Sequence, residues 1–82
     1  MTKFKLEIKT PEEVIYSGDI ESLVVPHPEG LEGYLANHEP TLSELVPGKL
    51  SYLEADQTES RELEITGGWL VFSDNQAVIF LR

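Results

Sequence analysis

The sequence has no cysteine, few basic residues and no long hydrophobic run, and each absence excludes a class of protein. Without cysteine there is no disulfide partner and no thiolate nucleophile, which fits a reducing compartment. No segment approaches the ~18 consecutive apolar residues that a membrane-spanning helix needs. The start of the chain alternates apolar and polar residues and lacks the apolar run of a signal peptide. We therefore expect a soluble, cytoplasmic protein.

The scarcity of basic residues excludes further partners. Six Lys and Arg residues stand against fifteen Asp and Glu residues, which gives a formal net charge of −9. Nucleic acids and anionic membrane surfaces are also negative, so long-range electrostatics oppose binding to either. The basic residues are dispersed and form no patch: Lys3, Lys5, Lys9, Lys49, Arg61 and Arg82. The natural complement of this chain is a basic protein surface, although the same charge would also serve solubility.

The length of 82 residues is near the lower limit for a domain that folds unaided. Hydrophobic residues make up 40%, which is enough for a compact core and too much for a disordered tail. We expect one domain over residues 1–82, without the interdomain cleft of a two-domain enzyme. Any function must then reside on the loops or faces of that domain.

Groups that could perform chemistry are also few. His27 and His38, without cysteine, are too few for a protein-only zinc site. The paired glycines lack the lysine and helix that complete a phosphate-binding loop. Glu62 and Glu64 alternate with apolar residues, which is typical of a solvated strand face rather than of an acid/base pair. We expect no catalytic residue, cofactor site or metal site, so an enzyme is the third interpretation.

Apolar and polar residues alternate along most of the chain. A period of two is typical of strands with one buried face. The expected strands cover residues 4–9, 14–16, 20–25, 31–35, 41–45, 49–55, 61–66, 69–72 and 77–81. About eight to ten short strands separated by turns predict an all-β sandwich or flattened barrel.

Turn residues predict how these strands are connected. A glycine within residues 17–19 predicts a bulge or corner that interrupts a strand. Residues 26–30 are expected to form a rigid loop. We expect residues 41–45 to be extended, although one helical turn is an alternative, because Pro47-Gly48 would stop any helix. Residues 73–75 contain an Asp-Asn pair that tolerates positive φ, so they predict a hairpin turn.

Six short motifs follow one another along the chain: Thr10-Pro11, Ser17-Gly18, Glu29-Gly30 with Gly33, His38 with Pro40, Pro47-Gly48, and Gly67-Gly68-Trp69. In this order and at this spacing they resemble the N-terminal domain of the ATP synthase epsilon subunit, called delta in mitochondria. The resemblance covers the whole chain. It implies a β-sandwich, or flattened barrel, of two roughly five-stranded antiparallel sheets.

The resemblance also implies a function. The family member is a non-catalytic central-stalk subunit, part of the rotor of a rotary F-type ATP synthase. It links the gamma subunit to the polar loops of the c-ring, so that ion transport, usually proton transport, is coupled to ATP synthesis. It is peripheral to the inner or plasma membrane on the cytoplasmic side, held there through the complex and not by inserting into lipid.

Two sets of partner-binding residues carry over by motif. The c-ring side would hold Glu29, Gly30, Leu31 and Glu32. The gamma side would hold His38, Leu42 and Ser43. Loops of the c-ring in this family carry an arginine, for which a carboxylate-rich segment is a suitable partner.

The sequence departs from the family pattern in three places. The family has an acid directly after the first glycine, whereas Leu31-Glu32 reverses that order and leaves open whether Glu29 or Glu32 meets the ring. Val71 stands where the family has a glutamate, which removes one expected polar contact. The family's C-terminal helical hairpin, which inhibits ATP hydrolysis in many members and binds ATP in some, is absent from the sequence. We expect the chain to do neither.

A free-standing β-sandwich adaptor or carbohydrate-binding module is the alternative. Such a module would need an exposed aromatic platform. The three Phe, three Tyr and one Trp are spread over the expected strands, which is typical of core packing, and we expect Trp69 to lie in the core. The aromatic pattern therefore favours the stalk subunit over a sugar-binding module.

Overall fold

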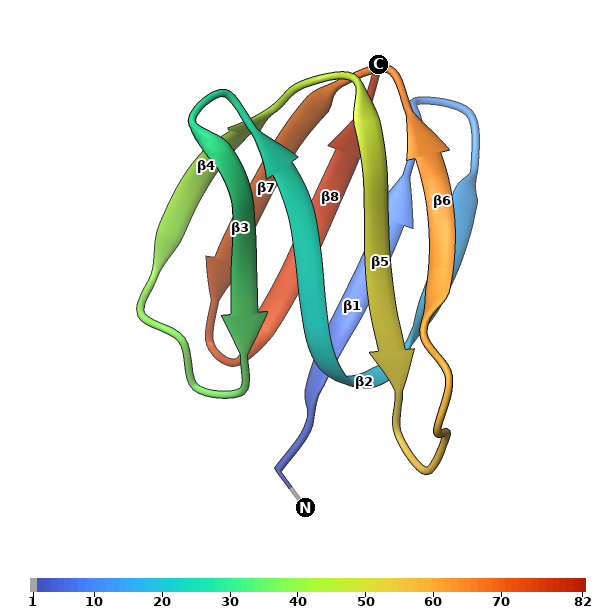
Figure 1. Cartoon of the computed structure of the whole chain (residues 1–82), viewed down its shortest axis with the longest axis vertical. Coiled ribbons are helices and arrows are strands. Elements are labelled where there is room, and N and C mark those ends of the chain that lie inside the picture. The colour runs from blue at the N-terminus through green and yellow to red at the C-terminus, as the bar shows by residue number, and fades with distance from the viewer. Residues whose placement is uncertain (1) are drawn as a thin grey trace.

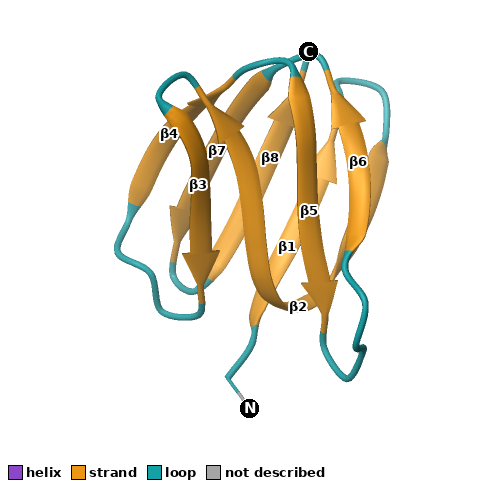
Figure 2. Ribbon diagram, viewed as in Figure 1, coloured by secondary structure: helices purple, strands orange, loops and turns teal. Residues whose placement is uncertain are grey.

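The computed structural model describes residues 2–82, which fold into eight strands joined by turns (Figures 1 and 2). The strands are β1 (Phe4–Lys9), β2 (Val14–His27), β3 (Gly30–Leu35), β4 (Thr41–Leu45), β5 (Gly48–Glu54), β6 (Arg61–Ile65), β7 (Gly68–Ser73) and β8 (Gln76–Leu81). The all-β prediction is confirmed, including the extended segment at β4. Within the described residues, no helix is long and apolar enough to span a bilayer.

All eight strands belong to one continuous sheet, which curls over to form a sandwich. The strand order is β4-β7-β8-β1-β2-β5-β6, with β3 also paired to β2. In Figure 1, β3, β2, β5 and β6 lie in front and β4, β7, β8 and β1 lie behind. The expected division into two five-stranded sheets is not found, because β2 takes part in both layers. One pair also departs from the expected antiparallel arrangement, since β1 and β8 are parallel.

The long strand β2 turns the corner between the layers. Its first half pairs with β1, and its second half pairs with β3 and β5. The predicted interruption at residues 17–19 is wrong, because the ladder with β1 runs through Leu6 opposite Gly18. The register shifts instead between Ile20 and Ser22, on the side that faces β5. A strand that shifts register there can bend from one layer into the other without breaking its hydrogen-bond ladder.

Tight turns connect most neighbouring strands. The predicted loop at residues 26–30 is instead a hairpin, because β2 continues to His27, which pairs with Gly30 at the start of β3. Gly30 has a φ of 124°, which a residue with a side chain rarely adopts. The β7–β8 hairpin is confirmed, and its turn residues Asp74 and Asn75 have φ of 50° and 58°. β5 and β6 also form an antiparallel hairpin.

The core lies between the two layers and is filled by the inward side chains of the alternating strands. Its buried hydrophobic residues are Phe4, Leu6, Ile8, Ile20, Leu23, Val25, Tyr34, Leu45, Leu50, Tyr52, Ile65, Leu70, Phe72, Ala77 and Ile79. The expectation that Trp69 joins them is wrong. Leu70 and Phe72 point into the core from β7, so Trp69, which precedes Leu70, points to the outside and is 46% exposed.

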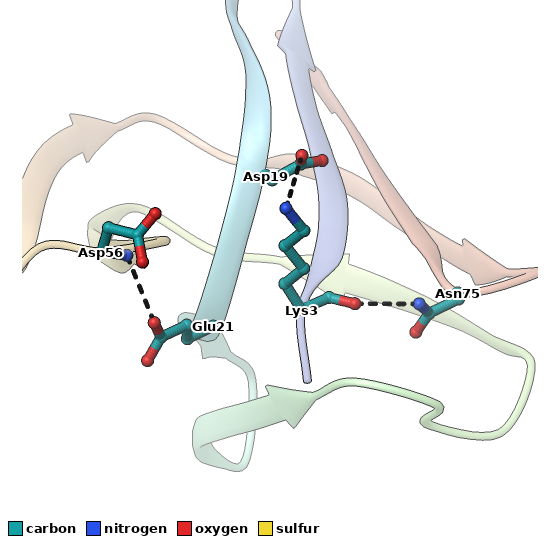
Figure 3. A network of polar contacts seen from close by, with 5 residues as sticks. All are labelled: Lys3, Asp19, Glu21, Asp56 and Asn75. Carbon is teal, nitrogen blue, oxygen red and sulfur yellow. Dashed lines mark hydrogen bonds and ion pairs between the residues drawn. The ribbon is translucent and has the colours of Figure 1, made fainter. Parts of the chain in front are cut away.

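Polar contacts tie the first strand to its neighbours at one end of the sandwich (Figure 3). The Lys3 ammonium lies 3.6 Å from the Asp19 carboxylate, and the Lys3 carbonyl accepts a hydrogen bond of 3.0 Å from the Asn75 amide. The Asn75 side-chain oxygen also accepts a bond of 2.6 Å from the backbone N–H of Asn37. Asn75 thus connects the start of β1, the β7–β8 turn and the loop that follows β3.

Candidate partner-binding surfaces

The β2–β3 hairpin presents one free carboxylate to solvent. Glu29 is exposed at the turn, and its backbone N–H donates a hydrogen bond of 3.2 Å to Nδ1 of His27. Gly30 begins β3, and Leu31 follows with 76% of its surface exposed. Glu29, Gly30 and Leu31 therefore lie together on an accessible tip, as a contact with another protein would require.

Glu32, the other candidate for the c-ring contact, points toward the interior. Its Oε1 accepts hydrogen bonds from the Tyr34 hydroxyl at 2.6 Å and from the Ser43 hydroxyl at 2.8 Å. Burial favours the neutral carboxyl, but the hydrogen bonds from Tyr34 and Ser43 favour the ion, and the net effect lowers the pKa of Glu32 below its ordinary value. The structure thus separates Glu32 from the accessible hairpin tip.

His38, assigned to the gamma side, also packs against the core. Its ring centroid lies 4.6 Å from that of Tyr34 and 5.5 Å from that of Phe72. Its Nδ1 lies 2.8 Å from the Glu39 carbonyl, a geometry that suits an N–H at that position. The ring is half-buried, so it offers only part of its surface to a partner.

Leu42 and Ser43 lie next to each other on β4 but face opposite ways. Leu42 points outward and is 68% exposed, whereas Ser43 is 4% exposed and bonds to Glu32. Strand alternation forces this division, since successive side chains emerge on opposite faces. Of the two β4 residues assigned to gamma, only Leu42 is accessible. The structure joins Ser43 to a residue assigned to the other partner.

Leu42 is part of a larger apolar surface on the outside of the back layer. The register places Leu42 beside Val71, Val71 beside Val78, and Trp69 beside Phe80. Trp69 and Phe80 are 46% and 44% exposed, and the two valines are half-buried. We call these five residues the outer apolar face. Contiguous apolar patches of this kind on a small protein mark interaction surfaces.

A shallow hollow adjoins this face at Phe80. It has a volume of about 250 Å³ and is lined by Lys9, Thr10, Pro11, Phe80 and Leu81. The Lys9 ammonium lies 5.3 Å from the centre of the Phe80 ring, within the range of a cation–π contact. The hollow could accept an apolar side chain of a partner, as interface anchors commonly require.

The prediction that the aromatic residues pack in the core is wrong for Trp69 and Phe80, which belong to a surface. The missing signal was the alternation within each strand. Leu70 and Phe72 in β7, and Ala77 and Ile79 in β8, share one parity and fill the core. Residues of the other parity must face outward, whatever their hydrophobicity. Several apolar residues with outward parity on adjacent strands therefore indicate a candidate interaction surface.

The acidic residues of the described chain are the remaining candidates for a site. Within residues 2–82, no group of three or more His, Asp or Glu residues is arranged to hold a metal ion. Glu62 and Glu64 are exposed on β6, as predicted for a solvated face. Glu32 and Glu54 are half-buried, and the carboxylate of each accepts a hydrogen bond from a tyrosine hydroxyl.

Several known proteins of similar sequence are ATP synthase epsilon chains. The chain is 34% identical to the ATP synthase epsilon chain of Chlorobium limicola over 76 residues, which cover 93% of this chain and 85% of that one. Against several other curated epsilon chains, it spans 59% of their length.

Solved structures share the fold. A chain in the mitochondrial ATP synthase of Euglena gracilis, solved as an assembly of OSCP, F1 and c-ring, has a TM-score of 0.89 at 24% identity, with 99% of this chain and 51% of that chain covered. A chain in the central stalk and c-ring of the Tetrahymena thermophila mitochondrial ATP synthase has a TM-score of 0.79 at 20% identity, with 94% and 61% covered.

The family comparison covers nearly the whole chain. Residues 3–82 match the beta-sandwich domain of the ATP synthase delta/epsilon chain. The match agrees with the order of the six motifs, with the all-β sandwich, and with the relatives of similar sequence. The chain therefore belongs to the ATP synthase delta/epsilon chain family, as its β-sandwich domain.

Proposed function

We propose that this protein works in the central stalk of a rotary ATP synthase by joining the gamma subunit to the c-ring. In this role the outer apolar face binds gamma, and the β2–β3 tip meets the polar loops of the ring. The protein performs no chemistry. It holds two parts of the rotor together, so that rotation driven by ion flow reaches the catalytic sites as torque. It is held at the cytoplasmic side of the membrane through these partners.

The outer apolar face is the observation that carries this proposal. A chain of 82 residues has little apolar surface to spare, yet Trp69, Phe80 and Leu42 leave 44–68% of their surfaces exposed on one side of one layer. Aromatic anchors surrounded by aliphatic residues are typical of the centre of a protein interface. The gamma assignment of Leu42 extends naturally across this face, because its neighbours on β7 and β8 are continuous with it.

Electrostatics support the assignment of the hairpin tip to the ring. Glu29 is exposed, and its carboxylate makes no ion pair with any residue in the described part of the chain. An arginine in a c-ring loop would form a charge-assisted hydrogen bond with such a carboxylate. The net charge of −9 would also attract a basic partner at long range.

Binding to gamma tests the proposal directly. We expect the chain and gamma to elute together at micromolar concentration in size-exclusion chromatography, as an equimolar complex. Trp69→Glu should separate them, because it places an unpaired charge in the centre of the interface. Leu35→Glu is the matched control, since Leu35 is 65% exposed on the front layer. Two separate monomers with the wild-type chain would overturn the proposal.

The contact with the ring has its own test. Glu29→Lys should weaken retention of the stalk on c-ring-containing membranes while gamma binding stays unchanged. Glu59→Lys is the control, because Glu59 is exposed in the β5–β6 turn and carries the same change of charge. Equal retention of both variants would remove the hairpin tip from the ring contact.

The exposed Trp69 and Phe80 also bear on the alternative of a carbohydrate-binding module. Sugars stack on aromatic rings but also need polar groups beside them. The charged residues opposite these rings are Glu44 and Lys9, and they are paired with Arg82 at 3.8 Å and Glu7 at 3.2 Å. The rest of the face is aliphatic. This composition favours a protein partner over a sugar.

A further inference from the structure

The sandwich has an open seam where an edge strand of the front layer meets an edge strand of the back layer. β3 pairs only with β2, and β4 pairs only with β7. In the described chain, no backbone ladder joins β3 to β4. The two strands carry different predicted surfaces, since the hairpin tip begins β3 and Leu42 lies on β4. Whatever holds this seam also fixes the two surfaces relative to each other.

One carboxylate oxygen bridges the seam. Oε1 of Glu32 on β3 accepts a hydrogen bond of 2.8 Å from the Ser43 hydroxyl on β4 and one of 2.6 Å from the Tyr34 hydroxyl. Ser43 and Tyr34 are 4% and 1% exposed, so both donors are shielded from water. Hydrogen bonds to an ionised acceptor are shorter and stronger than those between neutral groups. The bridge is therefore a strong, sheltered contact.

The surrounding contacts position this bridge. The Tyr34 ring packs almost parallel to Phe72 of β7, with centroids 5.8 Å apart and an interplanar angle of 13°. Beyond the end of β4, the Val46 N–H donates to the Pro26 carbonyl at 3.1 Å, which joins the same two layers. Glu32 lies between these two contacts and supplies the side-chain bond that links the paired part of β3 to that of β4.

From this geometry we infer that Glu32 is a positioning residue, which ties β3 to β4 and holds the hairpin tip in a fixed orientation to the outer apolar face. Glu29 is then the acid of this segment that meets a partner. The tie itself is a property of the isolated chain. Its effect on coupling rests on the proposed function, because only a stalk subunit must pass force from one surface to the other.

The isolated chain tests the tie without any partner. Glu32→Gln retains an oxygen acceptor but loses the charge, Glu32→Leu removes the acceptor, and Glu29→Gln is the matched control. We expect the backbone amides of β4 to exchange hydrogen about tenfold faster in Glu32→Leu, an intermediate effect in Glu32→Gln, and no change in Glu29→Gln. Unchanged β4 exchange in both Glu32 variants would overturn the inference.

A double-mutant cycle separates a specific bond from general loss of stability. Ser43→Ala and Glu32→Leu should each lower stability, and the double variant should lose clearly less than their sum, because both remove the same bond. The 13C resonance of the Glu32 carboxyl should also titrate at higher pH in Ser43→Ala. Additive losses together with an unchanged titration would show that Glu32 and Ser43 act independently.

The assembled synthase tests the consequence for coupling. Glu32→Gln should leave the amounts of bound gamma and c-ring unchanged but lower the rate of ATP synthesis at a fixed ion gradient, whereas Glu29→Lys should lower the bound c-ring itself. Loss of ring binding in Glu32→Gln without faster β4 exchange would make Glu32 a contact residue and overturn the inference. If the wild-type chain bound no gamma, the proposed function would fail while the exchange results still decided the tie.

Discussion

Trp69 and Phe80 lie opposite each other on β7 and β8, and both rings point away from the core. Core packing uses the residues on either side of them, such as Leu70 and Ile79, which are fully buried. Two large rings left at the surface of so small a domain do not contribute their full burial to its own stability. Under the proposed function gamma covers both rings, and this relationship leads to the first two predictions.

Trp69 is the one tryptophan in the sequence, so its fluorescence reports on the outer apolar face alone. We expect the free chain to emit at the long wavelength of a solvated indole, and the emission to shift to shorter wavelength when gamma covers the ring. Titration with gamma measures the shift. Phe80→Glu should abolish it at the same gamma concentration, and Leu35→Glu should preserve it.

Substitutions at neighbouring positions of β7 should differ in their effect on stability. Trp69→Ala should lower the free energy of unfolding by about 1 kcal/mol or less, because the ring is 46% exposed. Leu70→Ala should lower it by about 2–5 kcal/mol, because it leaves a cavity in the core. Urea denaturation measures both. Equal losses would mean that the indole is packed as tightly as the leucine.

Gly68 should tolerate no side chain. An alanine Cβ there would clash with the Phe80 carbonyl oxygen, and the backbone φ is 155°. We expect Gly68→Ala to lower the free energy of unfolding by about 2–4 kcal/mol. Gly33→Ala is the control, because its Cβ would meet its nearest atom, the Leu23 carbonyl oxygen, at 4.0 Å. A near-neutral Gly68→Ala would contradict the close approach of β7 and β8.

The Glu32 bridge predicts a pH dependence at the acid end. Its carboxyl has a pKa lowered by the hydrogen bonds from Tyr34 and Ser43, which outweigh the effect of burial. A lowered pKa in the folded state contributes stability above the unfolded pKa of about 4.3, and this contribution is lost as pH falls through the folded value. Wild type should therefore be more stable than Glu32→Gln at pH 6, and the difference should shrink below about pH 4. Thermal unfolding across this range measures it.

Tyr16 predicts a loss of stability at the alkaline end. Burial, and then its hydrogen bond of 3.0 Å to Glu54, raise the pKa of the Tyr16 hydroxyl to about 12. A raised pKa contributes stability below the unfolded value of 10.0, and this contribution is lost as pH rises toward 12. Tyr16→Phe should lose less stability than wild type between these pH values. Unfolding midpoints at pH 9 and pH 11.5 test this, and parallel slopes would contradict it.

Local alternation was sufficient to predict most strands. Phe4, Leu6 and Ile8 share one parity in β1, and all three are buried as that parity requires. The β7–β8 turn was also predictable, because Asp74 and Asn75 are residue types that tolerate positive φ. These features depend on neighbours along the chain, which sequence patterns describe directly.

Features that depend on distant segments were not predictable in this way. Gly18 predicted a break, but β1 supplies a continuous ladder beside it, so the strand continues. The sequence motif assigns Glu29, Gly30, Leu31 and Glu32 to one c-ring contact. It does not distinguish Glu32 from the three residues at the accessible tip. The alternation of β3 predicts apolar residues at inward positions, yet Glu32 occupies one of them. The hydrogen bond from Ser43, which lies on β4, explains this placement. No pattern within β3 contains that information.

The parallel pairing of β1 with β8 affects the order in which the protein can be built. These strands come from opposite ends of the described chain, and Lys5 pairs with Gln76. As the ribosome releases the polypeptide, the edge of β1 that pairs with β8 stays without its final neighbour until β2 to β7 and then β8 itself have been synthesised. Native contacts so distant in sequence slow folding, because a long loop must close first. A chaperone that shields this waiting edge would have its greatest effect on the nascent chain and little on the finished protein.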